Sequence, residues 1–335
     1  MRLPKFSVVI PAYNAERYLE QCLGSVAGQT LGDYELVIVD DGSIDSTPRI
    51  LDDFLRAHEL NSVVLRQDNQ GRLSARRAGL GKACGEYAVF LDSDDCLRAD
   101  ALEVLARCID RTDADVIGFG MSNELDFSSP YFSRGLPFGF FAGEEYRIAK
   151  RCVLQGRSNT LCGKAIRLAA FDRDIDYGRY AGLMHGEDLF QLLPVIDRAR
   201  SYEHTPEALY FYRRHSGAST ATYKPKQLDD VSTACGRLLE YGERWGMSKD
   251  AAYGALRNVL STVKILVRDP AARSIRSTEL DRAGAAIRGL GLDNCYSSVG
   301  LRPDDRVLVR ALLSGYHGAA VAAVGVVELC KKVRR

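Results

Sequence analysis

Three carboxylates follow a short apolar run in the first third of the chain. Residues 87–91 (YAVFL) have the composition of a buried strand, and Asp92, Asp94 and Asp95 come directly after them. Negative charge at the end of a buried strand is costly unless a cation or a hydrogen-bond donor compensates it. Because divalent cations bind through carboxylates together with phosphate oxygens, the string predicts a metal site for a phosphate-bearing substrate.

A capped turn is the alternative interpretation of this string. Aspartate is a favoured N-cap and turn residue, and the next helix is expected to begin near Ala99. One carboxylate is enough for a cap. Three carboxylates within four residues therefore favour the metal site.

The elements that would position this string alternate between strand and helix. Apolar runs predict strands over residues 6–10, 35–39, 61–65, 87–91 and 116–119. Between them, apolar residues at helical spacing predict four helices. This order predicts an α/β fold, in which a mostly parallel, Rossmann-like sheet is flanked by helices.

Polar or turn-forming residues follow three of the expected strands. They are Pro11, Ala12, Tyr13 and Asn14 after the first, Asp40, Gly42 and Ser43 after the second, and the string from Asp92 after the fourth. The carboxyl ends of parallel strands meet at one edge of the sheet, where ligands bind. Gly42 allows a tight turn with close backbone approach, and Asp40 can accept from a base or a ribose. The three strand ends together predict a nucleotide site.

A second acidic centre opens an apolar helix at Glu187 and Asp188. Acidic residues in a first turn also favour the helix dipole, so this pair is either a cap or a general base held near the metal. The later segment YFYRRHS contains Arg213, which could stabilise negative charge on a leaving diphosphate. The alternative interpretation of Arg213 is a solvated charge at the end of a strand.

Composition limits the classes of protein. The chain has 335 residues, 46% of them hydrophobic, so a large domain with an appended smaller unit is expected. A net charge of +1 argues against a nucleic-acid partner. Nine scattered cysteines suit free thiols in a reducing compartment. With no signal-peptide pattern and no run of ~18 apolar residues, a cytoplasmic location is expected.

The last third of the chain is expected to be helical from Tyr223 on, with a domain boundary near residue 222. Residues 122–141, rich in aromatics and glycines, predict loops or short antiparallel strands. The apolar segment 318–330 precedes a basic end, 331–335. Such a helix can lie on the inner face of an anionic membrane, pack on the core, or contribute to a homodimer, and these alternatives stay open.

As an ordered set, these motifs resemble the family 2 glycosyltransferases of the GT-A fold over about residues 5–222. The shared strings are PAYN at 11–14, VDDGS at 39–43, Asn69-x-Gly71, Ala75-Arg76, GEY at 85–87, FLDSDD at 90–95, Lys164, Glu187-Asp188 and Tyr212-Arg213. The resemblance implies a nucleotide-sugar half at about 1–120, an acceptor half at about 121–222, and a helical region at 223–335.

The resemblance also implies inverting transfer of a sugar from a UDP-sugar or another nucleotide sugar. Ala12, Tyr13 and Asp40 would hold the base, and Asp92 would lie near the ribose. Asp94, helped by Asp95, would bind Mn²⁺ or Mg²⁺, and Asp188 would be the catalytic base. The other implied substrate-binding residues are Pro11, Asn14, Gly42, Ser43, Asn69, Arg76, Ser93, Lys164, Glu187 and Arg213.

The acceptor implied by the family is a lipid-linked or polysaccharide hydroxyl in cell-surface glycan synthesis. Arg77 and Gly163 depart from the family pattern, which usually has asparagine at both places. His185 and His215 are either helpers of the metal and phosphates or ordinary polar residues. Two rival functions remain: a sugar-nucleotide nucleotidyltransferase, which would normally open with a glycine-rich basic loop, and a catalytically silent binding protein on the same fold.

Overall fold

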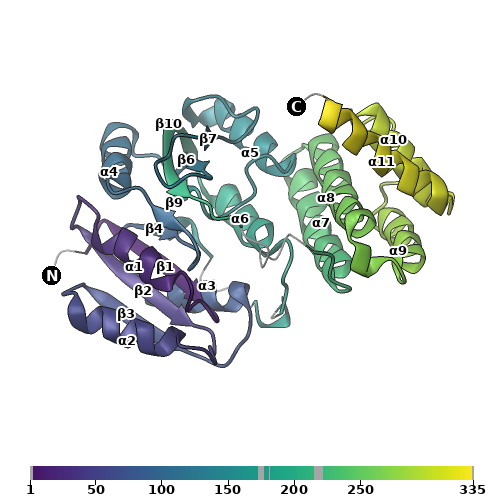
Figure 1. Ribbon diagram of the computed structural model, residues 1–335. Helices are drawn as coiled ribbons and strands as arrows, with labels where there is room; N and C mark the ends of the chain where they lie inside the picture. Colours follow the sequence, from purple (N-terminus) through teal and green to yellow (C-terminus); the bar gives the residue numbers. More distant parts are fainter. Residues whose placement is uncertain (1–2, 173–176, 181, 215–221, 334–335) are drawn as a thin grey trace. The chain divides into compact units, whose positions relative to one another are not determined.

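The computed structural model describes residues 3–172, 177–180, 182–214 and 222–333, and it contains two compact units (Figure 1). The first unit consists of Met1–Cys152 and Asn159–Arg214. The second consists of Val153–Ser158 and His215–Arg335. The helical unit therefore includes a six-residue segment from the middle of the chain, which the sequence had not indicated.

One sheet organises the first unit, with strand order β3-β2-β1-β4-β9-β6-β10-β5. Among the described residues, the strands that run in one direction are β1 (Phe6–Ala12), β2 (Tyr34–Asp40), β3 (Ser62–Arg66), β4 (Tyr87–Phe90), β6 (Val116–Ser122) and β10 (Ser201–Phe211). The opposite strands are the short β5 (Cys96–Leu97), β7 (Pro130–Tyr131), β8 (Gly139–Ala142) and β9 (Lys164–Arg167). The predicted α/β fold with a mostly parallel sheet is confirmed.

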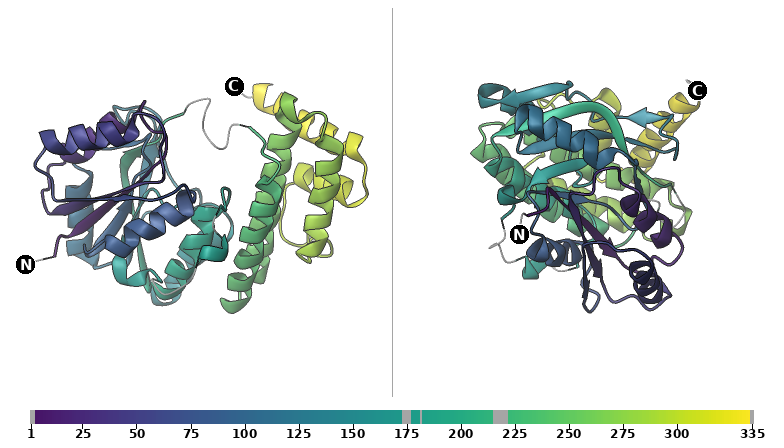
Figure 2. Two further views of the ribbon diagram at one scale, coloured as in Figure 1. Left: turned by 90° about the horizontal axis from the view of Figure 1, so that it is seen from below. Right: turned by 90° about the vertical axis from the view of Figure 1, so that its left-hand side faces the viewer.

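Helices cover this sheet. They are α1 (Leu19–Ala27), α2 (Thr47–Ala57), α3 (Arg72–Lys82), α4 (Ala101–Thr112), α5 (Tyr146–Leu154) and α6 (Glu187–Arg198). The residues that α1 buries are Leu19, Cys22, Leu23 and Val26, the stripe that its spacing predicts. Figure 2 (left) shows α1 and α2 on one side of β1–β4 and α3 on the other. Short 3-10 turns lie at Gly143–Glu145, Leu168–Ala170 and Gly178–Tyr180.

Several element boundaries differ from the sequence-based expectations. The helix expected near Ala99 begins at Ala101, because β5 separates it from the carboxylate string. Strand β10 begins at Ser201, and its register shifts between His204 and Ala208. Strand β9 was not expected; it lies between β4 and β6 and runs antiparallel to both.

The second unit is helical, as expected. Its helices are α7 (Gln227–Arg244), α8 (Ser248–Arg268), α9 (Arg276–Gly289), α10 (Pro303–Leu313) and α11 (His317–Val333), with a 3-10 turn at Pro270–Ala272. Glycines permit close packing here: a Cβ on Gly242 would overlap the side chain of Ala251. None of the described helices combines the length and apolarity needed to cross a membrane.

Candidate active site

The candidate site lies where strand order reverses. Strand β1 stands between β2 and β4, so the chain moves outward on one side of β1 and then returns to the other (Figure 1). At such a switch point the loops after the strands diverge and leave room for a ligand. Ala12 pairs in register with Asp40, and the Asp41 amide donates to the Ala12 carbonyl at 2.8 Å. The ends of β1 and β2 therefore lie side by side.

The loops after β1 and β2 are held together by side-chain hydrogen bonds. The Asn14 amide donates to Ser43 Oγ at 3.0 Å, and the Ile44 amide donates to Asn14 Oδ1 at 3.0 Å. Asp40 is buried and accepts from the Ser43 amide at 3.0 Å. Tyr13 is 47% exposed, so its ring is available for contact with a planar ligand. Pro11 and Ala12, which precede it in the chain, are buried.

Gly42 brings a third loop to this edge. Its φ is +76°, and a Cβ there would lie 2.7 Å from the Asn69 amide nitrogen, so only glycine fits without strain. The neighbouring carboxylate of Asp41 accepts from the amides of Gln70 at 3.0 Å and Gly71 at 2.8 Å. Exposed Asn69 is thereby positioned beside the end of β2. Asp41 had not been singled out, because an Asp-Gly pair is also an ordinary turn signal.

The centre of the site is a buried arginine. Arg76, on α3, has no solvent exposure and donates through Nη2 to Asp92 Oδ1 at 2.9 Å and through Nη1 to Asp188 Oδ1. The two carboxylate side chains remain 21% and 24% exposed. Burial opposes ionisation of Asp92, but Arg76 and Arg72 outweigh it, so the pKa of Asp92 is lowered. The structure thus brings the end of β4 and the start of α6 together around one cation.

The second arginine of α3 binds the other acidic residue. Arg72 Nη1 donates to Glu187 Oε1 at 3.0 Å, and the Glu187 side chain is buried. Burial and the negative charge of Asp188 raise the pKa of Glu187 to about 7. Arg72 and Arg76 are four residues apart, which places them on the same face of a helix. That spacing was a signal in the sequence, although Arg72 was not selected from it.

The string after β4 forms a tight loop that Arg213 and Tyr210 hold. Buried Asp95 accepts from the Tyr210 hydroxyl at 2.6 Å and from the Arg213 amide at 2.8 Å. Arg213 Nε donates to the Asp94 carbonyl oxygen at 2.7 Å. Burial, followed by repulsion from Asp94 and Asp92, raises the pKa of Asp95 to about 8. Arg213 therefore lies beside the carboxylates, and Asp95 shapes their loop.

The remaining candidates lie around this centre. Lys164 begins β9, is buried, and donates through Nζ to the Thr160 carbonyl at 2.5 Å. Burial lowers the pKa of Lys164 to about 8, against the opposing charge of Asp188. Ser93 is half-buried in the loop after β4, and His185 is half-buried just before α6. His215 lies outside the described residues.

Carboxylate oxygens at this edge suit a hard divalent cation. Within the described ranges, no three His, Cys, Asp or Glu side chains gather into a complete metal site. Asp92 is paired with Arg76, and Asp95 is engaged by Tyr210 and Arg213. Half-buried Asp94 lies between them in the same loop, where a metal could take its other ligands from a substrate. This ligand set fits Mg²⁺ or Mn²⁺, which are commonly held by one or two carboxylates plus phosphates.

Comparison with known proteins gives the enzyme family to which the chain is similar. A profile described as Glycosyl transferase family 2 matches residues 7–173. EpsJ, an uncharacterized glycosyltransferase of Bacillus subtilis (strain 168), is 33% identical over 265 residues, which cover 73% of this chain and 72% of EpsJ. TarS, the poly(ribitol-phosphate) beta-N-acetylglucosaminyltransferase of Staphylococcus aureus (strain Mu50 / ATCC 700699), is 29% identical over 235 residues, which cover 68% of this chain. The chain spans only part of some relatives: its alignment covers 65% of EpsH, a putative glycosyltransferase also from B. subtilis, and 39% of TarS.

Solved structures agree on the fold. The crystal structure of S. aureus TarS 1–349 in complex with UDP-GlcNAc has a TM-score of 0.69 at 20% identity and covers 97% of this chain and 92% of that one. The mannosyltransferase PcManGT from Pyrobaculum calidifontis, in complex with GDP-Man and Mn²⁺, has a TM-score of 0.50 at 16% identity, with 99% and 89% covered. The chain therefore belongs to glycosyl transferase family 2, and the GT-A fold that the resemblance implied is confirmed.

Proposed function

We propose that the protein transfers a sugar, with inversion, from a UDP-sugar to a hydroxyl of a lipid-linked or polysaccharide acceptor. TarS is a poly(ribitol-phosphate) beta-N-acetylglucosaminyltransferase, and its crystal structure contains UDP-GlcNAc; both facts support this donor and acceptor class. The observation that carries the proposal is the salt bridge of Arg76 to both Asp92 and Asp188. It joins the strand end where a nucleotide would bind to the helix start where a base would act.

The donor nucleotide would occupy the ends of β1, β2 and β4. Exposed Tyr13 would contact the base together with Ala12, and buried Asp40 would orient the loop that faces it. Asn69 would approach from the loop that Gly42 and Asp41 position. Asp92 would lie near the ribose, with its carboxylate kept ionised by Arg76. Pro11, Asn14, Ser43 and Ser93 would shape the same pocket.

Asp94 would be the chain's principal ligand for Mn²⁺ or Mg²⁺, with Asp95 supporting the loop that presents it. Bound there, the cation would neutralise charge on the departing diphosphate as a Lewis acid. Arg213, beside Asp94, would add a second positive charge on the leaving-group side. Because Arg213 Nη2 also binds Gln21 Oε1 at 2.6 Å, its guanidinium has a defined position.

Asp188 would take the proton of the acceptor hydroxyl as that oxygen attacks C1 of the sugar from the face opposite the diphosphate. Arg76 holds Asp188 by Oδ1, and no described side chain donates to Oδ2, which is the oxygen that would receive the proton. Attack opposite the leaving group inverts the configuration at C1. Glu187 and Lys164, both buried beside Asp188, would contact the acceptor or the transferred sugar.

The test is donor hydrolysis across a panel of nucleotide sugars, with Mn²⁺ and with a chelator, in the natural protein and in Asp188→Asn. We expect metal-dependent release of UDP from one or two donors and its loss in the variant. The variant replaces a carboxylate by an amide of the same shape, so folding should be retained.

Two outcomes count against the proposal. No turnover of any donor, together with no thermal shift on adding UDP and Mn²⁺, would favour a binding protein on this fold. Release of pyrophosphate from a nucleoside triphosphate and a sugar phosphate would favour a nucleotidyltransferase.

A further inference from the structure

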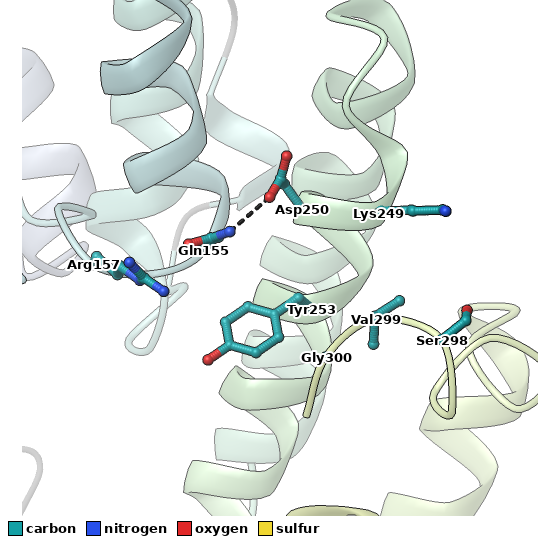
Figure 3. A pocket seen from close by; sticks show the side chains of 8 residues that line it. All are labelled: Gln155, Arg157, Lys249, Asp250, Tyr253, Ser298, Val299 and Gly300. Atoms are coloured by element: carbon teal, nitrogen blue, oxygen red, sulfur yellow. Dashed lines mark hydrogen bonds between the residues drawn. The ribbon is translucent and has the colours of Figure 1, made fainter. Parts of the chain in front are cut away.

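A pocket of about 400 Å³ lies wholly within the second unit, and none of its lining residues belongs to the candidate active site. Its walls come from the segment Val153–Ser158, from the first turns of α8, and from the chain just before α10 (Figure 3). Pockets of this size accommodate small ligands or part of a larger one.

The pocket is held in shape by several contacts. A Cβ on Gly254 would overlap the carbonyl oxygen of Leu154, so glycine lets α8 approach that backbone directly. Gln155 Nε2 donates to Asp250 Oδ1 at 2.6 Å, and Arg257 Nη1 donates to the Gln155 carbonyl at 3.3 Å. These contacts fix the wall that carries Arg157, two residues farther along.

The lining is polar and carries more positive than negative charge. It contains two cations, Arg157 and Lys249, against one carboxylate, Asp250, which already accepts from Gln155. Among the described residues, neither cation has a carboxylate partner, whereas Arg72 and Arg76 in the other unit are both paired. Only one lining side chain is aliphatic, and the hydroxyls of Tyr253 and Ser298 add hydrogen-bonding groups. An apolar or lipid ligand therefore does not suit this pocket.

The two cations stand at separate ends. Figure 3 shows Arg157 and the hydroxyl of Tyr253 on one side, and Lys249 with Ser298 on the other, with the Gln155–Asp250 hydrogen bond between them. A single small anion would reach only one of them. An extended ligand with negative groups spaced along its length would reach both, and its hydroxyls would meet the polar groups between.

We propose that this pocket binds an acidic glycan chain, one that carries phosphodiester or uronate groups, and so gives the enzyme a second hold on its acceptor. The choice of a glycan rests on the proposed function, whereas the anionic and extended character rests on the pocket alone. Because both cations are exposed, binding weakens as ionic strength rises.

The experiment measures binding to the full-length protein by fluorescence anisotropy, with no donor present. The labelled probes are a glycerol-phosphate oligomer, an oligogalacturonate and neutral maltoheptaose. The pocket variant is Arg157→Gln with Lys249→Gln. The matched control is Lys224→Gln with Arg310→Gln, which removes the same charge from exposed positions of the same unit that do not line the pocket.

We expect both or one of the acidic probes to bind, the neutral probe not to bind, and the pocket variant to bind about tenfold more weakly or worse. Binding of one acidic probe alone would identify the phosphodiester or the uronate as the source of charge. Equal weakening in the control, no weakening in the pocket variant, equal binding of maltoheptaose, or full competition by millimolar inorganic phosphate would each overturn the proposal.

Failure of the proposed function would look different. Donor hydrolysis is expected to be unchanged in the pocket variant, because none of its residues belongs to the candidate active site. If the natural protein binds an acidic probe but turns over no donor, and the pocket variant loses that binding, the pocket proposal is supported and the transferase proposal fails. Thermal unfolding of both variants shows whether each remains folded.

Discussion

Arg76 binds Asp188 from a fully buried position on α3, while the Asp188 side chain itself remains 24% exposed. The cation is therefore shielded from water, and the carboxylate that it holds still reaches solvent and a substrate. The same guanidinium holds Asp92. One side chain thus sets the spacing between the two halves of the candidate site.

Replacing this arginine should affect stability and turnover in different degrees. In Arg76→Met the two carboxylates lose their shared counter-ion, and we expect the free energy of unfolding to fall by about 2–4 kcal/mol. Arg76→Lys keeps a charge but lacks the fork that reaches two carboxylates, so it should lose less stability and most of the donor turnover. Urea unfolding and UDP release measure these effects.

Arg66→Met is the control for this prediction, because Arg66 forms an exposed ion pair with Asp52. Exposed pairs contribute about 0–1 kcal/mol, so the control should change little. Full turnover in Arg76→Lys would show that the double bridge is not required.

Gly42, in the loop after β2, should not tolerate replacement even by alanine. In Gly42→Ala the left-handed backbone conformation and the close Asn69 amide both oppose the new Cβ. We expect a loss of about 1–3 kcal/mol and weaker binding of UDP. Gly24→Ala is the opposite case, since a Cβ there meets no atom within 4 Å and the residue is inside α1. The free energy of unfolding of Gly24→Ala should rise by about 0.5–1 kcal/mol. Thermal unfolding measures both variants, and a change of the same sign in both would contradict this prediction.

Lys164 should make stability depend on pH. Its folded-state pKa is about 8, whereas an unfolded lysine titrates near ~10.4. Between these values the unfolded chain binds more protons, so the contribution of this group to stability rises with pH and is lowest below about pH 8. Lys164→Met should raise the free energy of unfolding at pH 7 by roughly 1–3 kcal/mol and remove that rise.

Urea unfolding at pH 7, 8, 9 and 10 measures the effect of Lys164. Lys82→Met, at an exposed lysine at the end of α3, should leave the pH profile unchanged. A natural protein whose stability does not rise from pH 8 to pH 10 would contradict the assignment of this group.

Substitutions of the two carboxylates after Ser93 should affect different properties, stability for Asp95 and the metal requirement for Asp94. Asp95→Ala leaves the Tyr210 hydroxyl and the Arg213 amide without their acceptor, and we expect a loss of about 1–3 kcal/mol. Asp94→Asn should change stability less and should raise the Mn²⁺ concentration needed for donor turnover. Isothermal titration with Mn²⁺ and UDP tests this, and the reverse pattern would exchange the roles of the two residues.

Much of the first unit could be predicted because local patterns and topology agree there. The apolar runs that became β1, β2, β3 and β4 are short and separated by amphipathic helices, so a mostly parallel sheet followed from general connection rules. Strand β9 could not be predicted in the same way. Its antiparallel insertion between β4 and β6 depends on contacts between residues far apart in the chain.

The site shows the same contrast. Asp92, Asp94 and Asp188 could be selected because each belongs to a local acidic string. The burial of Arg76 could not, since arginine normally indicates an exposed surface and its burial here depends on two partners from other elements. The part played by Tyr210 depends on a long-range hydrogen bond to Asp95, of which its own segment gives no sign.

The inclusion of Val153–Ser158 in the helical unit has a consequence for the order of synthesis. A ribosome completes this segment long before it makes α8, whose Gly254 packs on the backbone of Leu154. Leu154 is fully buried in the finished protein, so its packing surface is still missing while the chain is being made. A nascent chain therefore carries an unfinished segment in its middle, and a chimera that exchanges the helices with those of a relative must exchange these six residues as well.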